Sequence, residues 1–328
     1  MLVRFFRSHQ PVLLIIIPVI AALLWLPAFI HPALPAVKHQ MPLFELMVKP
    51  LLSNPLLCSI AAFFLLIIQA FLFNYIIDKY EITGKRSYLP VLMYIVFTSF
   101  SPELLWLHPG LFANIFILLA LNRVLATYRN TSALSPCFDA GFLIALASLF
   151  YFPAALMVIF VMIAVLVLLP FSWRLWVIVL LGFLLPYIYV HTWYFLFEGT
   201  EYLWIDRVLF PVIDRNTVFN GEMAQPYSEL ILFLGIAAVL SIGRGADAAN
   251  RSVQHRSTMA VLRWLFVIGV LTLLITPTLS YIYFFAALLP LLVIITGYFL
   301  WARMVWVAEI IMWMLILTIA YNHFGISH

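Results

Sequence analysis

Residues 55–77 read PLLCSIAAFFLLIIQAFLFNYII, a run of 23 residues without one charged side chain. A helix of that length is about 35 Å long, enough to cross the ~30 Å hydrocarbon core of a bilayer. The apolar residues are continuous and do not alternate with polar ones, which favours a transmembrane helix over a barrel strand. This stretch therefore predicts a helical membrane protein.

Composition extends that prediction to the whole chain. Of the 328 residues, 66% are hydrophobic and only 9% are charged, and the mean hydropathy is +1.12. A water-soluble globule needs more polar surface than this composition provides. We therefore expect an all-α, polytopic transmembrane bundle that forms one integral membrane domain over residues 1–328.

The chain contains eleven candidate spans, some of them short. Segments 88–100 and 137–151 fall below the ~20 residues that cross a bilayer upright, so re-entrant hairpins could reduce the number of spans to nine. The candidate spans are Pro11 to Ile30, Pro55 to Ile77, Tyr88 to Phe100, Gly110 to Thr127, Cys137 to Tyr151, Ala154 to Leu169, Leu175 to Phe197, Glu229 to Ile242, Leu262 to Thr276, Tyr281 to Trp301 and Val305 to Tyr321.

Lys and Arg are divided unequally between the two sides of this threading. With the amino terminus in the cytoplasm, thirteen of the 17 face the cytoplasm, which agrees with the positive-inside rule for the inner membrane. The net charge of +4 thus reflects membrane insertion and not a nucleic-acid-binding surface. The thirteen are Arg4, Arg7, Lys79, Lys85, Arg86, Arg123, Arg129, Arg174, Arg244, Arg251, Arg256, Arg263 and Arg303; the four outer ones are Lys38, Lys49, Arg207 and Arg215.

The first outer loop, residues 31–54, is predicted to contain an interfacial helix from Met41 to Leu52. A proline opens this segment and nearly all of its other residues are apolar, which is typical of a helix lying along a membrane surface. Glu45 and Lys49 stand four residues apart and therefore share one face. The helix is either an inert surface element with a modest ion pair or a platform that positions a lipid headgroup over Glu45.

A short outer connection holds two further candidates. Prolines stiffen the turns Ser101-Pro102-Glu103 and Trp106-Leu107-His108-Pro109, which holds Glu103 and His108 near the membrane surface. A carboxylate and an imidazole placed in this way could share proton transfer. The alternative is that both side chains simply face water.

The longest outer loop, residues 198–228, contains Arg207 and Arg215, each directly after an aspartate. A guanidinium group binds phosphate oxygens in a fork, so these arginines suit a phosphate or pyrophosphate ligand. His191, in the outer part of its span, is a third candidate for binding the lipid phosphate. Local pairing of each arginine with its neighbouring aspartate is the alternative.

Metal sites and cofactor motifs are not evident. The sequence has no Cys-x-x-Cys or His-x-x-x-His spacing and no glycine-rich phosphate loop, so we predict no metal and no cofactor beyond a polyprenyl-phosphate sugar donor. Amides inside the predicted spans are expected to form hydrogen bonds between helices. These amides are Gln69, Asn74, Asn114 and Asn122.

Several stretches resemble an uncharacterised inner-membrane family of Bacteroidota, and the resemblance covers most of the chain. They read RFFRSHQP at 4–11, GKRSYLP at 84–90, SPE at 101–103 and FDAGFLIALASLFYFP at 138–153. A looser architectural likeness is to the GT-C class of polyprenyl-phosphate-sugar glycosyltransferases, in which an outer loop with interfacial helices follows the first span. That likeness implies Glu45 or Glu103 as general base and Arg207 or Arg215 as the phosphate ligand. The chain departs from the class pattern because His31 and Pro32 stand where an acidic pair usually follows the first span.

The leading hypothesis is that the protein handles a polyprenyl-phosphate-linked sugar or glycolipid at the periplasmic face, with glycosyl transfer as the reaction if it is an enzyme. Its partners would then be membrane lipid, a lipid-linked sugar and other envelope proteins, and not nucleic acid. The first alternative is a non-enzymatic subunit that braces an envelope complex. The second is a transporter with a central path lined by Asn74, Asn114 and Asn122.

Overall fold

The computed structural model describes residues 2–8, 10–32, 34, 41–100, 102–128, 133–197, 253–275, 285–302 and 305–324. Within these residues the fold is all-α, as predicted, with thirteen α-helices and no strand. The elements are α1 (Leu2–Phe6), α2 (Leu13–Leu24), α3 (Leu26–Ile30), α4 (Pro42–Val48), η1 (Lys49–Leu51), α5 (Pro55–Lys79), α6 (Leu89–Thr98), η2 (Pro102–Leu105), α7 (Pro109–Leu125), α8 (Leu134–Phe150), η3 (Phe152–Leu156), α9 (Met157–Leu168), α10 (Trp173–Phe197), α13 (Val253–Ile275), α14 (Phe285–Trp301) and α15 (Val305–Phe324), where η marks a 3-10 helix.

The predicted apolar segments coincide with helices wherever the structure describes them. Ten of the eleven contain a helix, and the remaining segment, 229–242, lies outside the described residues. The first segment differs from the prediction because it is divided into α2 and α3 at Trp25. Pro27 lies in the first turn of α3, where proline fits because the first N–H groups of a helix have no acceptor within the helix.

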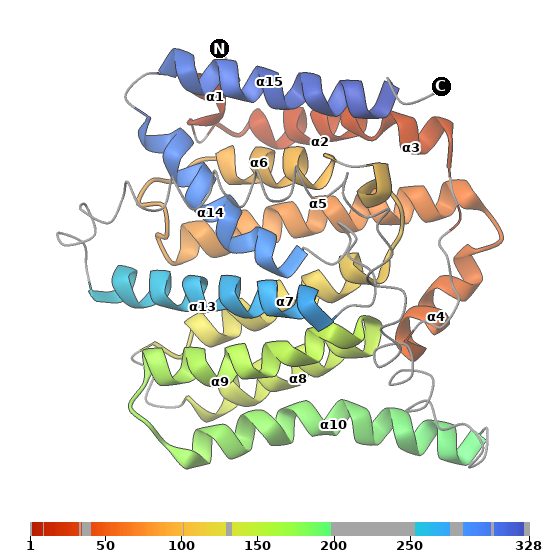
Figure 1. The fold of residues 1–328 in the computed structure, drawn as a ribbon, viewed down its shortest axis with the longest axis vertical. Coiled ribbons are helices and arrows are strands. Elements are labelled where there is room, and N and C mark those ends of the chain that lie inside the picture. The colour runs from red at the N-terminus through yellow and green to blue at the C-terminus, as the bar shows by residue number, and fades with distance from the viewer. Residues whose placement is uncertain are drawn as a thin grey trace.

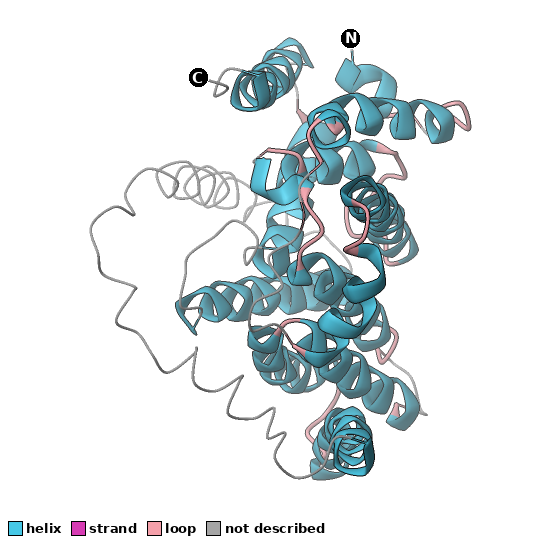
Figure 2. Cartoon of the chain, turned by 90° about the vertical axis from the view of Figure 1, so that its right-hand side faces the viewer, coloured by secondary structure: helices cyan, strands magenta, loops and turns pink. Residues whose placement is uncertain are grey.

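The helices lie side by side across the long axis of the molecule, with α15 at one end of the stack and α10 at the other (Figure 1). Figure 2, which looks along several of these helices, shows the same stack from the side. Successive helices from α5 to α10 alternate in direction in Figure 1. Their ends therefore gather on two opposite sides of the bundle.

Three described helical stretches are long and apolar enough to cross a membrane: Pro55–Lys79, Trp173–Phe197 and Val305–Asn322. The other apolar helices have 10–17 residues. The shortest predicted span corresponds to α6, in which all 10 residues are buried. A helix that is apolar on every side belongs in the interior of a protein. Because other helices surround α6, its length is not set by the thickness of a bilayer.

Two glycines allow α8 and α10 to pack backbone to backbone. A methyl group on Gly141 would overlap the carbonyl oxygen of Val179 in α10, and a methyl group on Gly182 would overlap that of Phe138 in α8. Small residues at such contacts let helices in a membrane approach closely, which replaces the hydrophobic driving force that lipid does not supply. This reciprocal contact holds α10, the last helix of the stack, against the bundle.

Candidate functional site

Polar contacts bring many helix ends together on one side of the bundle, which we call the basic end. It comprises α1 with the following Arg7, the connection 80–88, the last turns of α5, α7 and α14, and the first halves of α8, α10, α13 and α15, all on the left in Figure 1. Nine of the ten described Lys and Arg residues belong to these elements, and only Lys49 lies at the opposite end. The nine are Arg4, Arg7, Lys79, Lys85, Arg86, Arg123, Arg174, Arg256 and Arg263.

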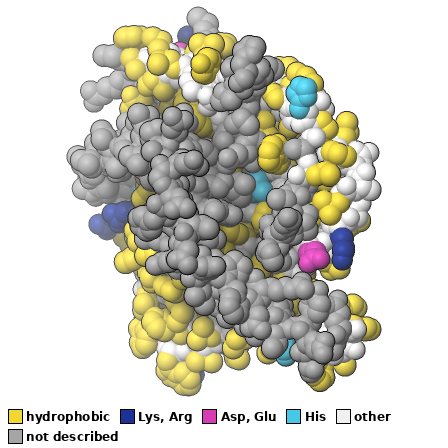
Figure 3. All heavy atoms as spheres, turned by 45° about the vertical axis from the view of Figure 1, so that its right-hand side comes forward, with side chains coloured by type: hydrophobic (Ala, Val, Ile, Leu, Met, Phe, Trp, Pro, Cys, Tyr) yellow, Lys and Arg dark blue, Asp and Glu magenta, His cyan; other side chains and the backbone are white. Residues whose placement is uncertain are grey.

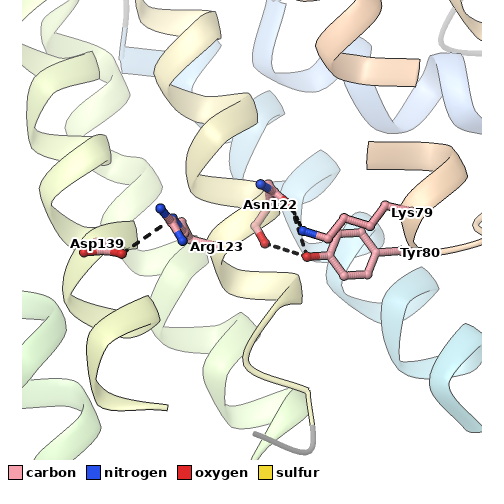
Figure 4. A network of polar contacts seen from close by, with 5 residues as sticks. All are labelled: Lys79, Tyr80, Asn122, Arg123 and Asp139. Carbon is pink, nitrogen blue, oxygen red and sulfur yellow. Dashed lines mark hydrogen bonds and ion pairs between the residues drawn. The ribbon is translucent and has the colours of Figure 1, made fainter. Parts of the chain in front are cut away.

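A network of polar contacts links α5, α7 and α8 at the basic end (Figure 4). Lys79 Nζ donates to Asn122 Oδ1 at 3.0 Å, and the Tyr80 hydroxyl donates to the carbonyl oxygen of Asn122 at 2.9 Å. Burial raises the pKa of Tyr80, so its hydroxyl keeps the proton that it donates. On the other side of α7, Arg123 Nε lies 3.5 Å from Asp139 Oδ2. That pair is partly exposed and therefore contributes little stability.

The amino-terminal segment fastens the last two helices to the bundle. The Arg7 guanidinium donates from Nε and Nη2 to the carbonyl oxygen of Phe299, at 2.9 and 2.6 Å, near the end of α14. A cation suits this position because the last carbonyls of a helix have no intrahelical donor and carry partial negative charge. Glu309 in α15 accepts a hydrogen bond from the backbone N–H of Arg4 at 3.1 Å. These contacts place the start of the chain beside α14 and α15.

The elements that carry three of the predicted site residues lie at the opposite end, where α4 contacts α7. Glu45 lies on α4, Glu103 on η2, and His108 directly before α7. The ring of Phe44 in α4 contacts the ring of Phe112 in α7 edge to face, with centroids 5.8 Å apart. Figure 3 shows few charged side chains among the described residues on the face it presents, and many hydrophobic ones.

Glu45 has the ion pair that its spacing predicts. Its carboxylate lies 3.7 Å from Lys49 Nζ, and both side chains are well exposed. The helix α4 buries Phe44 but leaves Leu46 and Met47 exposed at 70% and 53%. An exposed apolar side on a short helix beside an ion pair is typical of a helix at a lipid–water interface.

His108 is buried, so the expectation that its side chain faces water is wrong. The backbone N–H of Leu111 donates to His108 Nδ1 at 3.1 Å, which makes the imidazole the N-cap of α7. Burial lowers the pKa of His108 to about 3, because the low-dielectric surroundings disfavour imidazolium. The neutral ring therefore holds the start of α7. Proton transfer by this residue stays a prediction.

The other predicted site residues are less fully placed. Glu103 lies within η2, but only its backbone is described. Arg207 and Arg215 lie outside the described residues. His191 is exposed on α10 and stands nine residues after Gly182, about two and a half helical turns. It therefore lies on the side of α10 that faces away from α8.

A buried polar cluster in the middle of the bundle joins α5, α6 and α7. The Tyr94 hydroxyl donates to Gln69 Oε1 at 2.8 Å, and Asn114 Nδ2 donates to the same oxygen at 2.9 Å. Gln69 Nε2 donates to the carbonyl oxygen of Leu111 at 2.9 Å. The predicted interhelical bonds of Gln69 and Asn114 are confirmed. Tyr94 was not predicted, although a tyrosine inside an apolar segment signals a buried hydroxyl that needs a partner.

The remaining two amides differ from each other. Asn122 bonds across helices to Lys79 and Tyr80, as predicted. Asn74 instead donates to Asp78 of its own helix at 3.0 Å. Across the described ranges, no three His, Cys, Asp or Glu side chains are grouped so that they could hold a metal ion.

Comparison with known proteins gives a family and no function. No curated protein and no solved structure matches the chain. Residues 43–327 match the family described as "Family of unknown function (DUF6427)", a match that starts in α4 and continues past α15. The chain therefore belongs to DUF6427, a family of unknown function.

Proposed function

We propose that this chain is a multi-pass inner-membrane protein of a Bacteroidota cell, with its amino terminus and basic end in the cytoplasm. The separation of charge along the helices carries the proposal, since nine of the ten described Lys and Arg residues belong to the basic end. Membrane insertion retains Lys and Arg near span ends on the cytoplasmic side. The three long apolar helices supply spans of sufficient length.

We propose further that the opposite end, in the periplasm, handles a polyprenyl-phosphate-linked sugar or a similar glycolipid. The exposed Leu46 and Met47 would enter the lipid while the carboxylate of Glu45, on the same short helix, stays at headgroup level. The contact of α4 with α7 supports a shared site, because η2, which carries Glu103, leads directly into α7. In this proposal Arg207, Arg215 and His191 bind the lipid phosphate.

The reaction that suits these groups is glycosyl transfer. Glu45 or Glu103 takes the proton from an acceptor hydroxyl, and that oxygen forms a bond to the anomeric carbon of the sugar. The bond from this carbon to the phosphate oxygen breaks at the same time, and polyprenyl phosphate leaves with the electron pair. Attack from the face opposite the leaving group inverts the configuration. His108 acts as a positioning residue, because its cap fixes where α7 begins and hence where η2 joins it.

Topology and activity are tested separately. Reporter fusions are expected to place the amino terminus in the cytoplasm and a site after Asn220 in the periplasm; the reverse result would refute the orientation.

To test the activity, Glu45, Glu103, Arg207 and Arg215 are changed singly to alanine, and envelope glycolipids are quantified. Loss of one product is expected. Glu81→Gln, at an exposed carboxylate of the basic end, is the matched control. Unchanged products at normal protein levels in all four variants would exclude the site.

A non-enzymatic subunit of an envelope complex is the second candidate, and one observation favours it. Tyr189, Trp193 and Phe197 form a stripe along α10 and are 66%, 62% and 67% exposed. Aromatic residues at this spacing can dock against a helix of another protein. Purification in mild detergent distinguishes the candidates: a stoichiometric protein that is lost on Trp193→Ala supports the subunit, and a co-purifying lipid phosphate supports the glycolipid function.

A further inference from the structure

The end of α5 combines an unpaired cation, hydrogen-bond donors and an apolar track. Lys79 is exposed, and no carboxylate in the described part of the chain lies within ion-pair distance of it. Its ammonium donates to Asn122 Oδ1 at 3.0 Å and lies 5.5 and 5.2 Å from the ring centroids of Tyr75 and Tyr80. These contacts fix the position of the positive charge and leave further N–H groups available.

Asn122 adds donors to the same place. Its Oδ1 accepts from Lys79 and from the Tyr80 hydroxyl, so the geometry of the amide turns Nδ2 away from both. Arg123, the next residue in the chain, adds a second positive charge nearby, although its guanidinium is directed toward Asp139 (Figure 4). The nitrogen donors and the charge of Lys79, which has no ion-pair partner among the described carboxylates, favour an anion with several acceptor oxygens, such as a phosphate.

An apolar track runs along α5 away from Lys79. Phe64, Ile68 and Tyr75 are 61%, 51% and 53% exposed, and their spacing places them on the same side of the helix as Lys79. Lys79 stands eleven positions after Ile68, a rise of about 16 Å, which is close to half of the ~30 Å hydrocarbon core of a bilayer. One acyl chain reaches from a headgroup to the bilayer midplane over this distance.

We propose that Lys79 and Asn122 bind the phosphate of an anionic phospholipid in the cytoplasmic leaflet, with one acyl chain along Tyr75, Ile68 and Phe64. A soluble phosphate would use the same donors but would gain nothing from the track. The track therefore selects the lipid as the occupant. The inference rests on the proposed membrane orientation, because only then does the basic end meet the anionic leaflet.

The test is native mass spectrometry of the purified full chain in mixed micelles with phosphatidylglycerol or with phosphatidylcholine. We expect at least one phosphatidylglycerol to bind in preference to phosphatidylcholine. Lys79→Gln should weaken the binding of phosphatidylglycerol about fivefold. Lys79→Arg, which keeps the charge, should retain most of the binding. Lys49→Gln, at an exposed lysine of the opposite end, is the matched control and should bind as the wild type does.

Three results would overturn the assignment. These are equal binding of both lipids by the wild type, equal loss in the Lys79→Gln and Lys49→Gln variants, and displacement of the lipid by excess glycerol 3-phosphate, which would identify a soluble phosphate site. Thermal melting of each variant is the control that separates weaker binding from unfolding of the protein. Tyr75→Ser should weaken the binding of phosphatidylglycerol without altering the response to glycerol 3-phosphate. If binding fails while the reporter after Asn220 faces the periplasm, this inference alone is wrong; a cytoplasmic reporter would reject the orientation.

Discussion

Lowering the pH should destabilise the folded protein because His108 becomes protonated. The substitution His108→Asn should remove this pH dependence. The Nδ1 atom of His108 accepts the N–H of Leu111 and caps α7. Protonation would place a hydrogen on Nδ1, facing that N–H, and would put a positive charge at the positive end of a helix. Asparagine is among the best N-cap residues and does not titrate in this range. His108→Asn therefore keeps the cap and removes the proton.

The size of the effect follows from the two pKa values. The pKa of His108 is lowered from 6.5 to about 3 in the folded protein. A depressed folded-state pKa means that the unfolded chain binds the proton first, so the stabilisation is full above pH 6.5 and falls as the pH drops toward 3. Between pH 7.5 and pH 5.0 this linkage removes about 2 kcal/mol from the free energy of unfolding. The loss would reach about 4 kcal/mol at pH 3.

The assay is the free energy of unfolding in mild detergent, measured at pH 7.5, 6.5, 5.5 and 5.0 for the wild type and His108→Asn. Other titrating groups contribute equally to both proteins, so the difference between the two pH profiles isolates His108. The wild type should lose about 2 kcal/mol more than the variant over this range. Parallel profiles would show that the imidazole is accessible to protons in the folded state, and the burial argument would be wrong.

Four further substitutions test the contacts between helices by unfolding in the same detergent. Gly141→Ala or Gly182→Ala should lower the free energy of unfolding by about 1–3 kcal/mol, because the added methyl group meets a backbone carbonyl that cannot move alone. A decrease below about 0.5 kcal/mol would mean that α8 and α10 lie farther apart. Tyr94→Phe removes the bond that the hydroxyl donates to Gln69 Oε1 and the bond that it accepts from Asn114 Nδ2. It should cost about 0.6–1.7 kcal/mol, and no loss would place water in the cluster. Asp139→Asn should change stability by less than about 0.5 kcal/mol, since its ion pair is half exposed; a larger loss would show a strong pair.

Local patterns predicted much of the fold and part of the candidate site. The run from Pro55 to Ile77 is uncharged and mostly apolar over more than six turns, so its helix could be predicted from this segment alone. The positions of the described helices and the segregation of the basic residues follow from the same local signals. The ion pair between Glu45 and Lys49 was predicted from spacing alone, because residues four apart on a helix are neighbours.

The environment of individual polar residues was not predictable in this way. His108 was expected at a wet surface and is buried, since the turn sequence does not show which helices pack around it. The hydrogen bonds of Tyr94 to Gln69 and Asn114 exist because α5 and α7 both lie within hydrogen-bond distance of its side chain, which the sequence of its own segment does not show. The same holds for Lys79, whose charge meets Asn122 from a helix more than forty residues away in the chain.

The all-α class, the helix positions and the separation of the basic residues from the opposite end follow from the amino-acid sequence alone, because hydrophobic length and charge act within single segments. The packing of the helices established that Gly141 faces the backbone of Val179 and Gly182 that of Phe138, that α6 is enclosed, and that Lys79 stands at the end of an apolar track beside Asn122. Those properties depend on which helix faces meet. When helices are apolar on nearly every side, the hydrophobic pattern does not mark one face for contact. The packing of small and polar side chains then determines which helix faces meet.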